Sequence, residues 1–287
     1  MKILITGAGT ILGNAIAQRL LSKNFKVIAT YRNSFPKLKK HKNLKLLKLD
    51  LNEKIKINES YNVLIHCASA IPSYKISSKQ MIETNYHGFV KLVNNAIKNN
   101  CKKIILISTM SVYGKINKKF VDESFNCKPI DAYGKSKKMM ENYINNLPKK
   151  FNIVSIIFRL SGVVGKNSHS YISRVLKKID LGEKIIFSNP NLKFNTFIHV
   201  DNFADIVSSF IKLHKINCIF NIGTIFPLKL KSIILTLFRT RKIKPNYKII
   251  NSSNKGYSIK LSSNLKKKCK IYSTKKTLDL LIQQNQS

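Results

Sequence analysis

The first residues of the chain combine a short apolar strand, a glycine-rich turn and a helix. The strand Lys2–Thr6 reads KILIT, and a helix is predicted from Ile11 to Lys23. Between them and just inside the helix stand Gly7, Gly9 and Gly13. Glycines in such a turn let the backbone approach a pyrophosphate, and the helix N-terminus supplies N–H donors and a positive dipole. This order of elements predicts a dinucleotide-binding turn at the edge of a parallel sheet.

The spacing of the glycines departs from the two common patterns of such turns. One pattern places a glycine where Leu12 stands, and the other places one where Thr10 stands. A glycine-rich turn without a ligand is therefore the alternative interpretation. Because the strand and the helix flank the turn correctly, we expect it to bind a cofactor through Gly7, Gly9, Thr10, Ile11, Leu12 and Gly13.

Further apolar strands alternate with amphipathic helices along the first half of the chain. The expected strands are 25–30, 44–49, 62–66, 103–108 and 152–158, and one long helix is expected over 79–99. Strands that are apolar throughout are typical of a parallel sheet covered by helices on both faces. The pattern predicts an α/β fold with a doubly wound parallel sheet.

The regular alternation ends after Gly165. Shorter elements follow, and the tail is lysine-rich and mixed in pattern. We expect a dinucleotide-binding domain over 1–164, to which 196–222 returns. Residues 165–195 and 223–287 are expected to form a smaller substrate-binding region at the C-terminal edge of the sheet, where such sheets bind ligands.

The charge of the chain is extreme, with 52 Lys and Arg against 13 Asp and Glu and a net charge of +39. Only six of the basic residues are arginine, and the lysines are spread from end to end. Together with abundant Asn and Ile, this composition is what AT-rich coding favours. We interpret the charge as a solvated lysine surface, and a surface selected to bind nucleic acid or another polyanion is the alternative.

The apolar runs and the cysteines of the sequence bear on where in the cell the protein is expected. No apolar run reaches the roughly 18 residues that a membrane-spanning helix needs. Because the first strand starts at Lys2, no signal peptide is expected. The five cysteines form no CxxC pair, so we expect no zinc or other metal site. A cytoplasmic location is expected.

Residues at the ends of the next strands bear on the choice of cofactor. The second strand is followed by Arg32, without an acid that would bond a ribose 2′-hydroxyl, and arginine binds phosphate well. NADP is therefore preferred over NAD. Asp50 and Leu51 follow the third strand and are expected near the adenine, although Asp50 is equally suited to cap a turn. Ala68 lies in a stretch of small residues that a cofactor can cross, and His66 before it is interpreted as a packed histidine.

A tyrosine and a lysine stand four residues apart at the start of a helix that Asp131 is expected to cap. The i, i+4 spacing puts Tyr133 and Lys137 on one face, one turn apart. An ammonium beside a phenol favours the phenolate and lowers the phenol pKa from about 10. The preceding segment Ser108–Gly114 (STMSVYG) adds hydroxyls at the same sheet edge, where they can hold a substrate oxygen during proton transfer.

Taken together, these motifs resemble the extended short-chain dehydrogenase/reductases, the NAD(P)-dependent epimerase/dehydratase family. The glycine turn, STMSVYG, YGKSK, the segment Phe158–Gly165 and FIHVD at 197–201 occur in the family's order, and the resemblance runs from residue 2 to about 225. It implies a Rossmann-type fold and hydride transfer between the nicotinamide and a sugar carbon.

The resemblance also implies roles for single residues. Tyr133 is the expected acid–base, Lys137 lowers its pKa and holds the nicotinamide ribose, and Thr109 matches the catalytic Ser or Thr. Asn85 matches an asparagine that supports the active site. The expected substrate-binding residues are Ser111, Tyr113, Gly162 and Asn195.

Departures from the family pattern narrow the reaction. Dehydratases of the family carry an Asp–Glu pair after the threonine, where this chain has Met110 and Ser111, so a 4,6-dehydratase is not expected. Gly162 replaces a frequent asparagine. Asn195 replaces an arginine that binds the substrate diphosphate, and Lys193 is a possible substitute for it.

The resulting prediction is a sugar-nucleotide epimerase or 4-keto-reductase of polysaccharide biosynthesis, with NADP or NAD as cofactor. Relatives suggest a homodimer through paired helices that include the one bearing Tyr133. A non-catalytic NADP-binding regulatory module and a polyanion-binding protein are the alternatives from other functional classes. Specific nucleic-acid binding is not expected.

Overall fold

A computed structural model describes residues 1–73, 75–147, 149–213, 217–253 and 255–285. The chain divides into two compact units, and each is described on its own. Unit 1 comprises 1–115, 126–159 and 204–220, and unit 2 comprises 116–125, 160–203 and 221–287. The domain boundaries expected from the sequence stay a prediction.

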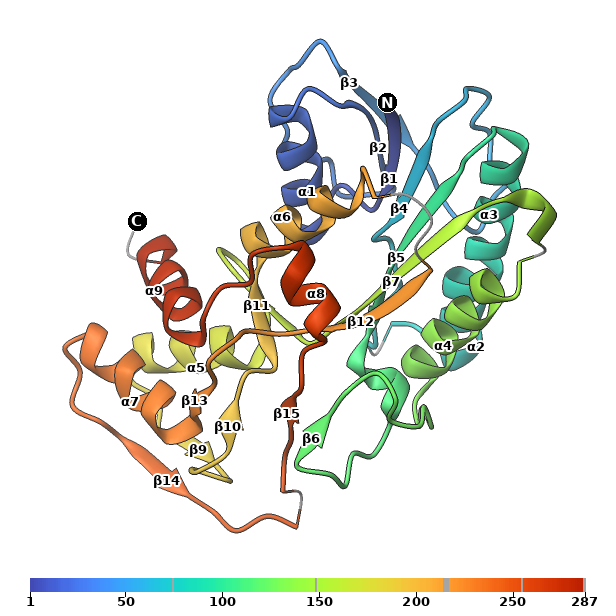
Figure 1. Cartoon of the computed structure of the whole chain (residues 1–287). Helices are drawn as coiled ribbons and strands as arrows, with labels where there is room; N and C mark the ends of the chain where they lie inside the picture. Colours follow the sequence, from blue (N-terminus) through green and yellow to red (C-terminus); the bar gives the residue numbers. More distant parts are fainter. Residues whose placement is uncertain (74, 148, 214–216, 254, 286–287) are drawn as a thin grey trace. The chain divides into compact units, whose positions relative to one another are not determined.

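Unit 1 is built on a seven-stranded parallel sheet with the order β12-β7-β5-β4-β1-β2-β3 (Figure 1). Its strands are β1 (Lys2–Thr6), β2 (Lys26–Tyr31), β3 (Leu44–Lys48), β4 (Val63–His66), β5 (Lys103–Thr109), β7 (Val154–Leu160) and β12 (Cys218–Ile222). From β1 the chain winds to β2 and β3 on one side, and β4, β5, β7 and β12 extend the sheet on the other. This topology confirms the doubly wound fold and makes the carboxyl ends of β1 and β4 the expected ligand-binding edge.

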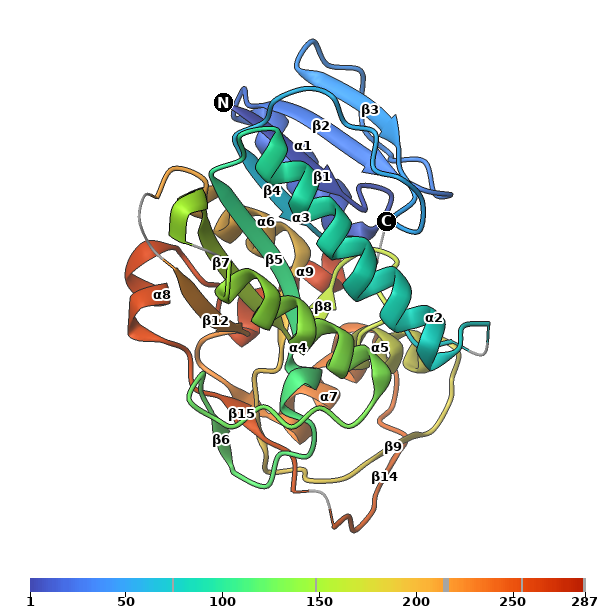
Figure 2. The same cartoon turned by 90° about the vertical axis from the view of Figure 1, so that its right-hand side faces the viewer.

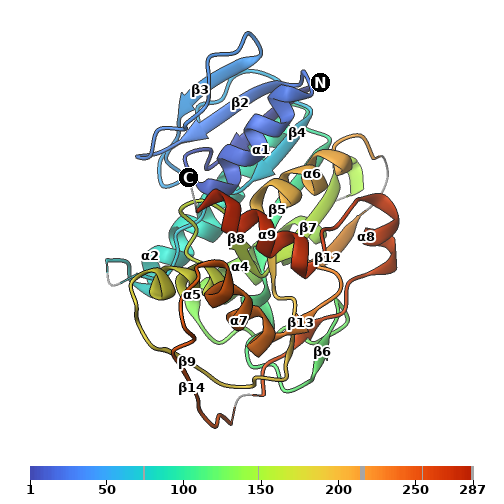
Figure 3. The ribbon, with the colours of Figure 1, turned by 90° about the vertical axis from the view of Figure 1, so that its left-hand side faces the viewer.

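Helices cover both faces of this sheet. Figure 2 shows α3 and α4 across one face, and Figure 3 shows α1 and α6 across the other. These helices are α1 (Ile11–Ser22), α3 (Gly88–Lys98), α4 (Ala132–Asn145) and α6 (Val200–Phe210), with the short turns η2 (Met110–Tyr113) and η3 (Lys149–Phe151). Apolar side chains of α3 and α4, among them Leu92 and Met140, pack on buried strand residues such as Leu64 and Leu106.

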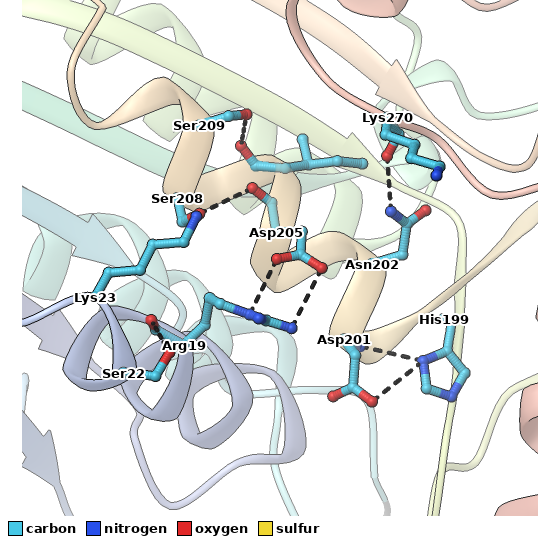
Figure 4. A network of polar contacts seen from close by, with 11 residues as sticks. Arg19, Ser22, Lys23, His199, Asp201, Asn202, Asp205, Ser208, Ser209 and Lys270 are labelled. Atoms are coloured by element: carbon cyan, nitrogen blue, oxygen red, sulfur yellow. Dashed lines mark hydrogen bonds and ion pairs between the residues drawn. The ribbon is translucent and has the colours of Figure 1, made fainter.

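Polar contacts join the two helices on the second face. The Nε of Arg19 on α1 lies 3.0 Å from a carboxylate oxygen of Asp205 on α6 (Figure 4). One turn further, Lys23 Nζ donates to Ser208 Oγ at 2.7 Å. Both Arg19 and Asp205 are about one-third exposed, so this pair contributes little to stability.

The long helix predicted over 79–99 is confirmed, but one of its turns is wider than an α-helical turn. The segment consists of α2 (Ser78–Ile82), a π-helical turn η1 (Glu83–His87) and α3. The widened turn contains Asn85, whose buried side chain bonds backbone and hydroxyl groups outside its own helix. Such insertions are frequent at functional sites, and the apolar pattern of a sequence does not reveal them.

Unit 2 contains helices and short two-stranded pairs. Its apolar core joins α5, α7 and α9 through side chains such as Ile179, Ile234 and Leu281. Its elements are β6 (Phe120–Val121), β8 (Gly162–Val164), α5 (Tyr171–Asp180), β9 (Ile185–Phe187), β10 (Lys193–Phe194), β11 (Phe197–His199), β13 (Leu228–Lys229), α7 (Leu230–Thr240), β14 (Tyr247–Ile249), β15 (Ser258–Ile259), α8 (Ser263–Lys268) and α9 (Thr274–Gln284). Within the described residues of both units, no helix is long and apolar enough to cross a membrane.

Candidate active site

The glycine turn after β1 is closely packed against the neighbouring backbone. Gly7 has a φ of +72°, and a Cβ there would lie 2.8 Å from the Cα of Ala68 at the end of β4. A side chain at Gly9 would overlap the carbonyl oxygen of Ser34, and one at Gly13 would overlap that of Gly7. The three glycines are therefore needed for the turn to reach its position beside β4.

Thr10, which stands where one turn pattern requires glycine, caps helix α1. Its Oγ1 accepts a hydrogen bond from Gly13 N at 3.1 Å and donates to Gly7 O at 2.8 Å. The hydroxyl thus closes the turn and satisfies one N–H group at the helix N-terminus. The positive end of the α1 dipole follows the turn, as anion binding requires.

An open cavity lies at the carboxyl edge of the sheet. Seven expected cofactor residues line it: Gly7, Gly9, Thr10, Arg32, Asp50, Leu51 and Ala68. Ser69, Ala70 and Thr84 also line it and were not predicted. Ser69 and Ala70 belong to the stretch of small residues around Ala68 that a cofactor was expected to cross, whereas the sequence gives no signal for Thr84. Ile11, Leu12 and Gly13 form the first turn of α1 and are not among the lining residues.

Arg32 and Asp50 lie on the wall of this cavity. Arg32 is exposed, and its guanidinium has no hydrogen-bond or ion-pair partner among the residues that the structure describes. It also lines an adjoining cavity with Asn52 and Gln80. The carboxylate of Asp50 accepts a hydrogen bond from Asn52 N at 2.9 Å, so Asp50 both caps a turn and faces the cavity.

His66 at the end of β4 is fully buried, as the sequence interpretation expected. Its Nδ1 lies 2.8 Å from Thr6 Oγ1, and its ring packs 4.8 Å from that of Phe89. Burial, together with the charge of Lys137, holds the pKa of His66 well below its usual range. The imidazole is therefore neutral and part of the core.

Asn85 ties three segments together. Its Oδ1 accepts from Ala70 N at 2.7 Å, and its Nδ2 donates to Ala70 O at 3.0 Å and to Ser136 Oγ at 3.1 Å. Ser69 Oγ also donates to Oδ1 at 3.2 Å. Asn85 thus fixes the end of β4 to helix α4, but it is not among the residues that line the cavity.

Helix α4 begins as predicted and carries Tyr133 and Lys137 on one face. Asp131 is its N-cap and accepts a hydrogen bond from Gly134 N at 2.7 Å. The ammonium of Lys137 lies 5.8 Å from the ring centroid of Tyr133 and donates to Ile107 O at 2.9 Å. The side chain of Lys137 is buried, and Tyr133 is partly buried.

The expected lowering of the Tyr133 pKa is not found in this structure. Burial raises the pKa of Tyr133, and a hydrogen bond with Ser69 offsets this only in part. Burial also lowers the pKa of Lys137 to about 8, against smaller opposing effects of Cys67 and Glu141. The expectation was wrong because desolvation of the phenol and the charge of Asp131 both raise the pKa of Tyr133, and because the ammonium of Lys137 is bonded to a carbonyl.

The hydroxyl segment lies directly against α4. A Cβ on Gly134 would be 2.5 Å from Ser111 O, so this glycine allows the helix to approach η2. Thr109 Oγ1 donates to Ser111 Oγ at 3.2 Å and accepts from Ser111 N at 3.2 Å. Gly134, which follows Tyr133, therefore allows α4 to lie against the segment Thr109–Ser111 at one edge of unit 1.

Two expected substrate residues, Gly162 and Asn195, lie in unit 2. Gly162 begins β8, where a Cβ would be 3.3 Å from both Ser170 Cβ and Thr196 O. Asn195 is buried, and its Nδ2 donates to Thr224 O at 3.1 Å and Ile259 O at 2.9 Å. Its Oδ1 accepts from Ile259 N at 2.8 Å. The amide of Asn195 therefore holds segments of unit 2 together.

The described residues contain no cluster of three or more His, Cys, Asp or Glu that could hold a metal ion. Tyr133, Lys137 and Thr109 are not among the residues that line the glycine-turn cavity, but Tyr133 hydrogen-bonds Ser69, which does line it. The cavity fits a dinucleotide, because glycine backbone, a helix N-terminus and an unpaired guanidinium face it.

Comparisons with known proteins agree with this geometry. A model of the NAD dependent epimerase/dehydratase family matches residues 3–223. A putative UDP-glucose 4-epimerase of Methanocaldococcus jannaschii is 29% identical over 238 residues, which are 77% of this chain and 76% of that protein. The dTDP-4-dehydro-6-deoxyglucose reductase of Escherichia coli is 28% identical over 257 residues, 82% of this chain and 80% of that protein.

Among solved structures, that of a UDP-glucose 4-epimerase from Thermotoga maritima with UDP-glucose has a TM-score of 0.81 and 20% identity. The alignment covers 100% of this chain and 99% of that one, which supports the same fold. The family model covers well over half of the chain and includes the glycine turn, the hydroxyl segment and the Tyr133 helix. The protein belongs to the NAD-dependent epimerase/dehydratase family of extended short-chain dehydrogenase/reductases.

Proposed function

We propose that the protein is a sugar-nucleotide epimerase or 4-keto-reductase that uses Tyr133 as its acid–base. The observation that carries this proposal is the close approach of α4 to the hydroxyl segment, with Lys137 one turn from Tyr133. The related proteins named above act on UDP-glucose or on a dTDP-linked keto sugar, according to their names. A smaller substrate-binding region formed largely by unit 2 belongs to the same proposal.

Bound NAD(P) supplies the nicotinamide carbon that accepts or donates a hydride. Tyr133 Oη removes the proton from the sugar hydroxyl as the carbon is oxidised, and returns a proton when the ketone is reduced. Thr109 Oγ1 holds the same sugar oxygen by a hydrogen bond. Ser111 and Gly162 are kept as expected substrate-binding residues. We leave out Tyr113, which is buried and bonded to Arg159, and Asn195, whose amide is already bonded within unit 2.

Lys137 has two tasks in this proposal. Its ammonium stabilises the phenolate of Tyr133 during proton transfer and holds the ribose next to the nicotinamide. Burial raises the pKa of Tyr133 in this structure. For the ammonium of Lys137 to lower that pKa, the ammonium must leave Ile107 O or share its hydrogens between Ile107 O and the phenol. A pKa of about 8 keeps Lys137 largely charged at neutral pH.

A 4,6-dehydratase activity is disfavoured, although the family includes dehydratases. The two positions after Thr109 hold Met110, which is buried, and Ser111, which hydrogen-bonds Thr109. Neither carries a carboxyl group that can remove or deliver a proton during elimination of water. Incubation with dTDP-glucose is expected to yield no 4-keto-6-deoxy product.

NADP is the preferred cofactor in this proposal. The guanidinium of Arg32, unpaired among the described residues, stands where the main cavity meets its neighbour and suits a 2′-phosphate. Calorimetric titration is expected to give tighter binding of NADPH than of NADH. Arg32→Ala should remove that preference and leave NADH binding unchanged, whereas equal affinities in the wild type would contradict it.

A homodimer through α3 and α4 is also proposed. An open groove between these helices is lined by Tyr86, Asn94, Met139, Tyr143 and Leu147, among others. Burial of this partly apolar groove in a second copy fits the helix pairing that the resemblance to the family implies. Light scattering after gel filtration is expected to give twice the mass of one chain.

The activity is tested with C4-deuterated NADPH and two probes, UDP-glucose and dTDP-4-keto-6-deoxyglucose. A reductase transfers deuterium to the keto sugar, and an epimerase interconverts UDP-glucose and UDP-galactose without net cofactor oxidation. Tyr133→Phe should abolish both reactions with little loss of cofactor affinity. Tyr61→Phe is the matched control, because it also removes a phenol hydroxyl with a hydrogen bond, to Asn95, in unit 1. Cofactor binding without either reaction would favour a non-catalytic module.

A further inference from the structure

A third ionisable residue follows Tyr133 and Lys137 on the same face of α4. Glu141 stands one turn beyond Lys137, so residues 133, 137 and 141 form one row along the helix. Its side chain is completely buried, in a chain with only 13 acidic residues. Buried carboxylates of this kind are rare unless they are paired.

Glu141 is paired on both carboxylate oxygens. Arg159 of β7 donates from Nε to Oε1 at 3.0 Å and from Nη2 to Oε2 at 2.7 Å. Ser108 Oγ of β5 donates to Oε1 at 2.6 Å, and Lys138 Nζ lies 3.6 Å from Oε2. The carboxylate thus connects α4 to two neighbouring strands of the sheet.

Arg159 extends this connection to the hydroxyl segment. Its Nη1 donates to Tyr113 Oη at 2.8 Å, and its guanidinium carbon lies 4.9 Å from the centroid of the Tyr113 ring. Ser108 directly precedes Thr109, and Tyr113 ends η2. The segment that carries Thr109 and Ser111 is therefore held on both sides by one ion pair.

Stability alone is a weak explanation for this arrangement. A buried ion pair gains little over apolar residues of the same volume, because both charges lose their hydration. The planar guanidinium of Arg159, in contrast, fixes the orientation of its partners, since it bonds both carboxylate oxygens of Glu141 and the phenol of Tyr113 at once. Neither Glu141 nor Arg159 lines the cofactor cavity.

We propose that Glu141 and Arg159 are positioning residues that fix the rotation of α4, and with it Tyr133 and Lys137, relative to Thr109 and Tyr113. The inference rests on the proposed roles of Tyr133 and Thr109. Arg159 acts through Tyr113 on one side and through Glu141 on the other. The arrangement sets the geometry of proton transfer, and it changes cofactor affinity little, because most of the expected cofactor contacts lie at the glycine-turn cavity, which neither residue lines.

The test uses Arg159→Lys, which keeps the buried charge but loses the fork. We expect kcat to fall about tenfold or more, since small errors in placement are costly, while the cofactor Kd changes less than about twofold. In a Tyr113→Phe background, the same substitution should have a much smaller effect on kcat, because the two residues act as one unit. Asp205→Asn, which breaks the Arg19–Asp205 pair in the same unit, is the matched control and should change neither quantity, because both side chains are about one-third exposed.

A second readout needs no substrate. With ¹³Cζ-labelled tyrosine, the signals of Tyr113 and Tyr133 are assigned from the two phenylalanine variants. Arg159→Lys should shift both signals, and Asp205→Asn neither. An unchanged Tyr133 signal, or an equal loss of kcat with and without the Tyr113 hydroxyl, would overturn the proposal. If the wild type turns over no nucleotide sugar, the proposed function fails and the Tyr133 signal alone decides this inference.

Discussion

Replacing Lys137 by methionine is expected to stabilise the cofactor-free protein while it abolishes activity. The ammonium is buried, and its pKa falls from 10.5 in the unfolded chain to about 8 in the folded protein. A difference of about 2.5 pKa units corresponds to roughly 3 kcal/mol of destabilisation at pH 7. Lys137→Met also loses the hydrogen bond to Ile107 O, which lowers the stability of the variant by about 1 kcal/mol. The variant should therefore have a free energy of unfolding about 2 kcal/mol higher than the wild type.

The higher stability of Lys137→Met should disappear as the pH rises. Between pH 8 and 10.5 the unfolded wild type binds more protons at this lysine than the folded one, so the wild type gains stability with pH. At pH 10 the cost of burying the ammonium falls below about 1 kcal/mol, and the two proteins should then have similar stability.

Urea denaturation of both proteins at pH 7 and pH 10 measures this difference. Lys135→Met is the matched control, because Lys135 is exposed on the same helix, and it should change stability by less than about 0.5 kcal/mol at either pH. A Lys137→Met protein that is less stable at pH 7, or equally stabilised at both pH values, would refute the reasoning.

Two further substitutions test the local structure of the site. Gly13→Ala would place a Cβ against Gly7 O and should weaken NADPH binding about tenfold or more by calorimetry. Gly182→Ala strains the backbone at a φ of +71° but meets no neighbouring atom and lies outside the glycine turn, so it should leave NADPH binding unchanged. Asp131→Ala removes the N-cap of α4 and should lower the free energy of unfolding by about 1 kcal/mol in urea, and an unchanged midpoint would argue against the cap.

The sequence predicted the sheet because its strands are apolar throughout and its helices amphipathic. It also predicted the cap at Asp131, since a side chain that accepts from the third N–H has a recognisable spacing. The π-turn around Asn85 was missed, because one extra residue in a helical turn hardly changes the apolar pattern over 79–99. Helices α7 and α9 lay in a tail whose lysines obscure the apolar face.

Site residues that depend on distant contacts were the least predictable. Asn195 was expected to bind substrate, but its amide bonds the backbone at Thr224 and Ile259, which no local pattern indicates. The raised pKa of Tyr133 was missed for the same reason, since burial is a property of the packed protein. The sequence indicates the network of Glu141 and Arg159 by one feature only, the position of Glu141 four residues after Lys137 on the same helix face as Tyr133.

The central claim is that Tyr133 carries the proton in an NAD(P)-dependent reaction on a nucleotide sugar. Its most direct test compares the wild type and Tyr133→Phe in deuterium transfer from labelled NADPH to dTDP-4-keto-6-deoxyglucose and in epimerisation of UDP-glucose. The account predicts at least one reaction in the wild type and a loss of about a hundredfold or more in the variant, with cofactor affinity nearly unchanged. A variant that binds the cofactor and reacts at the wild-type rate would contradict it.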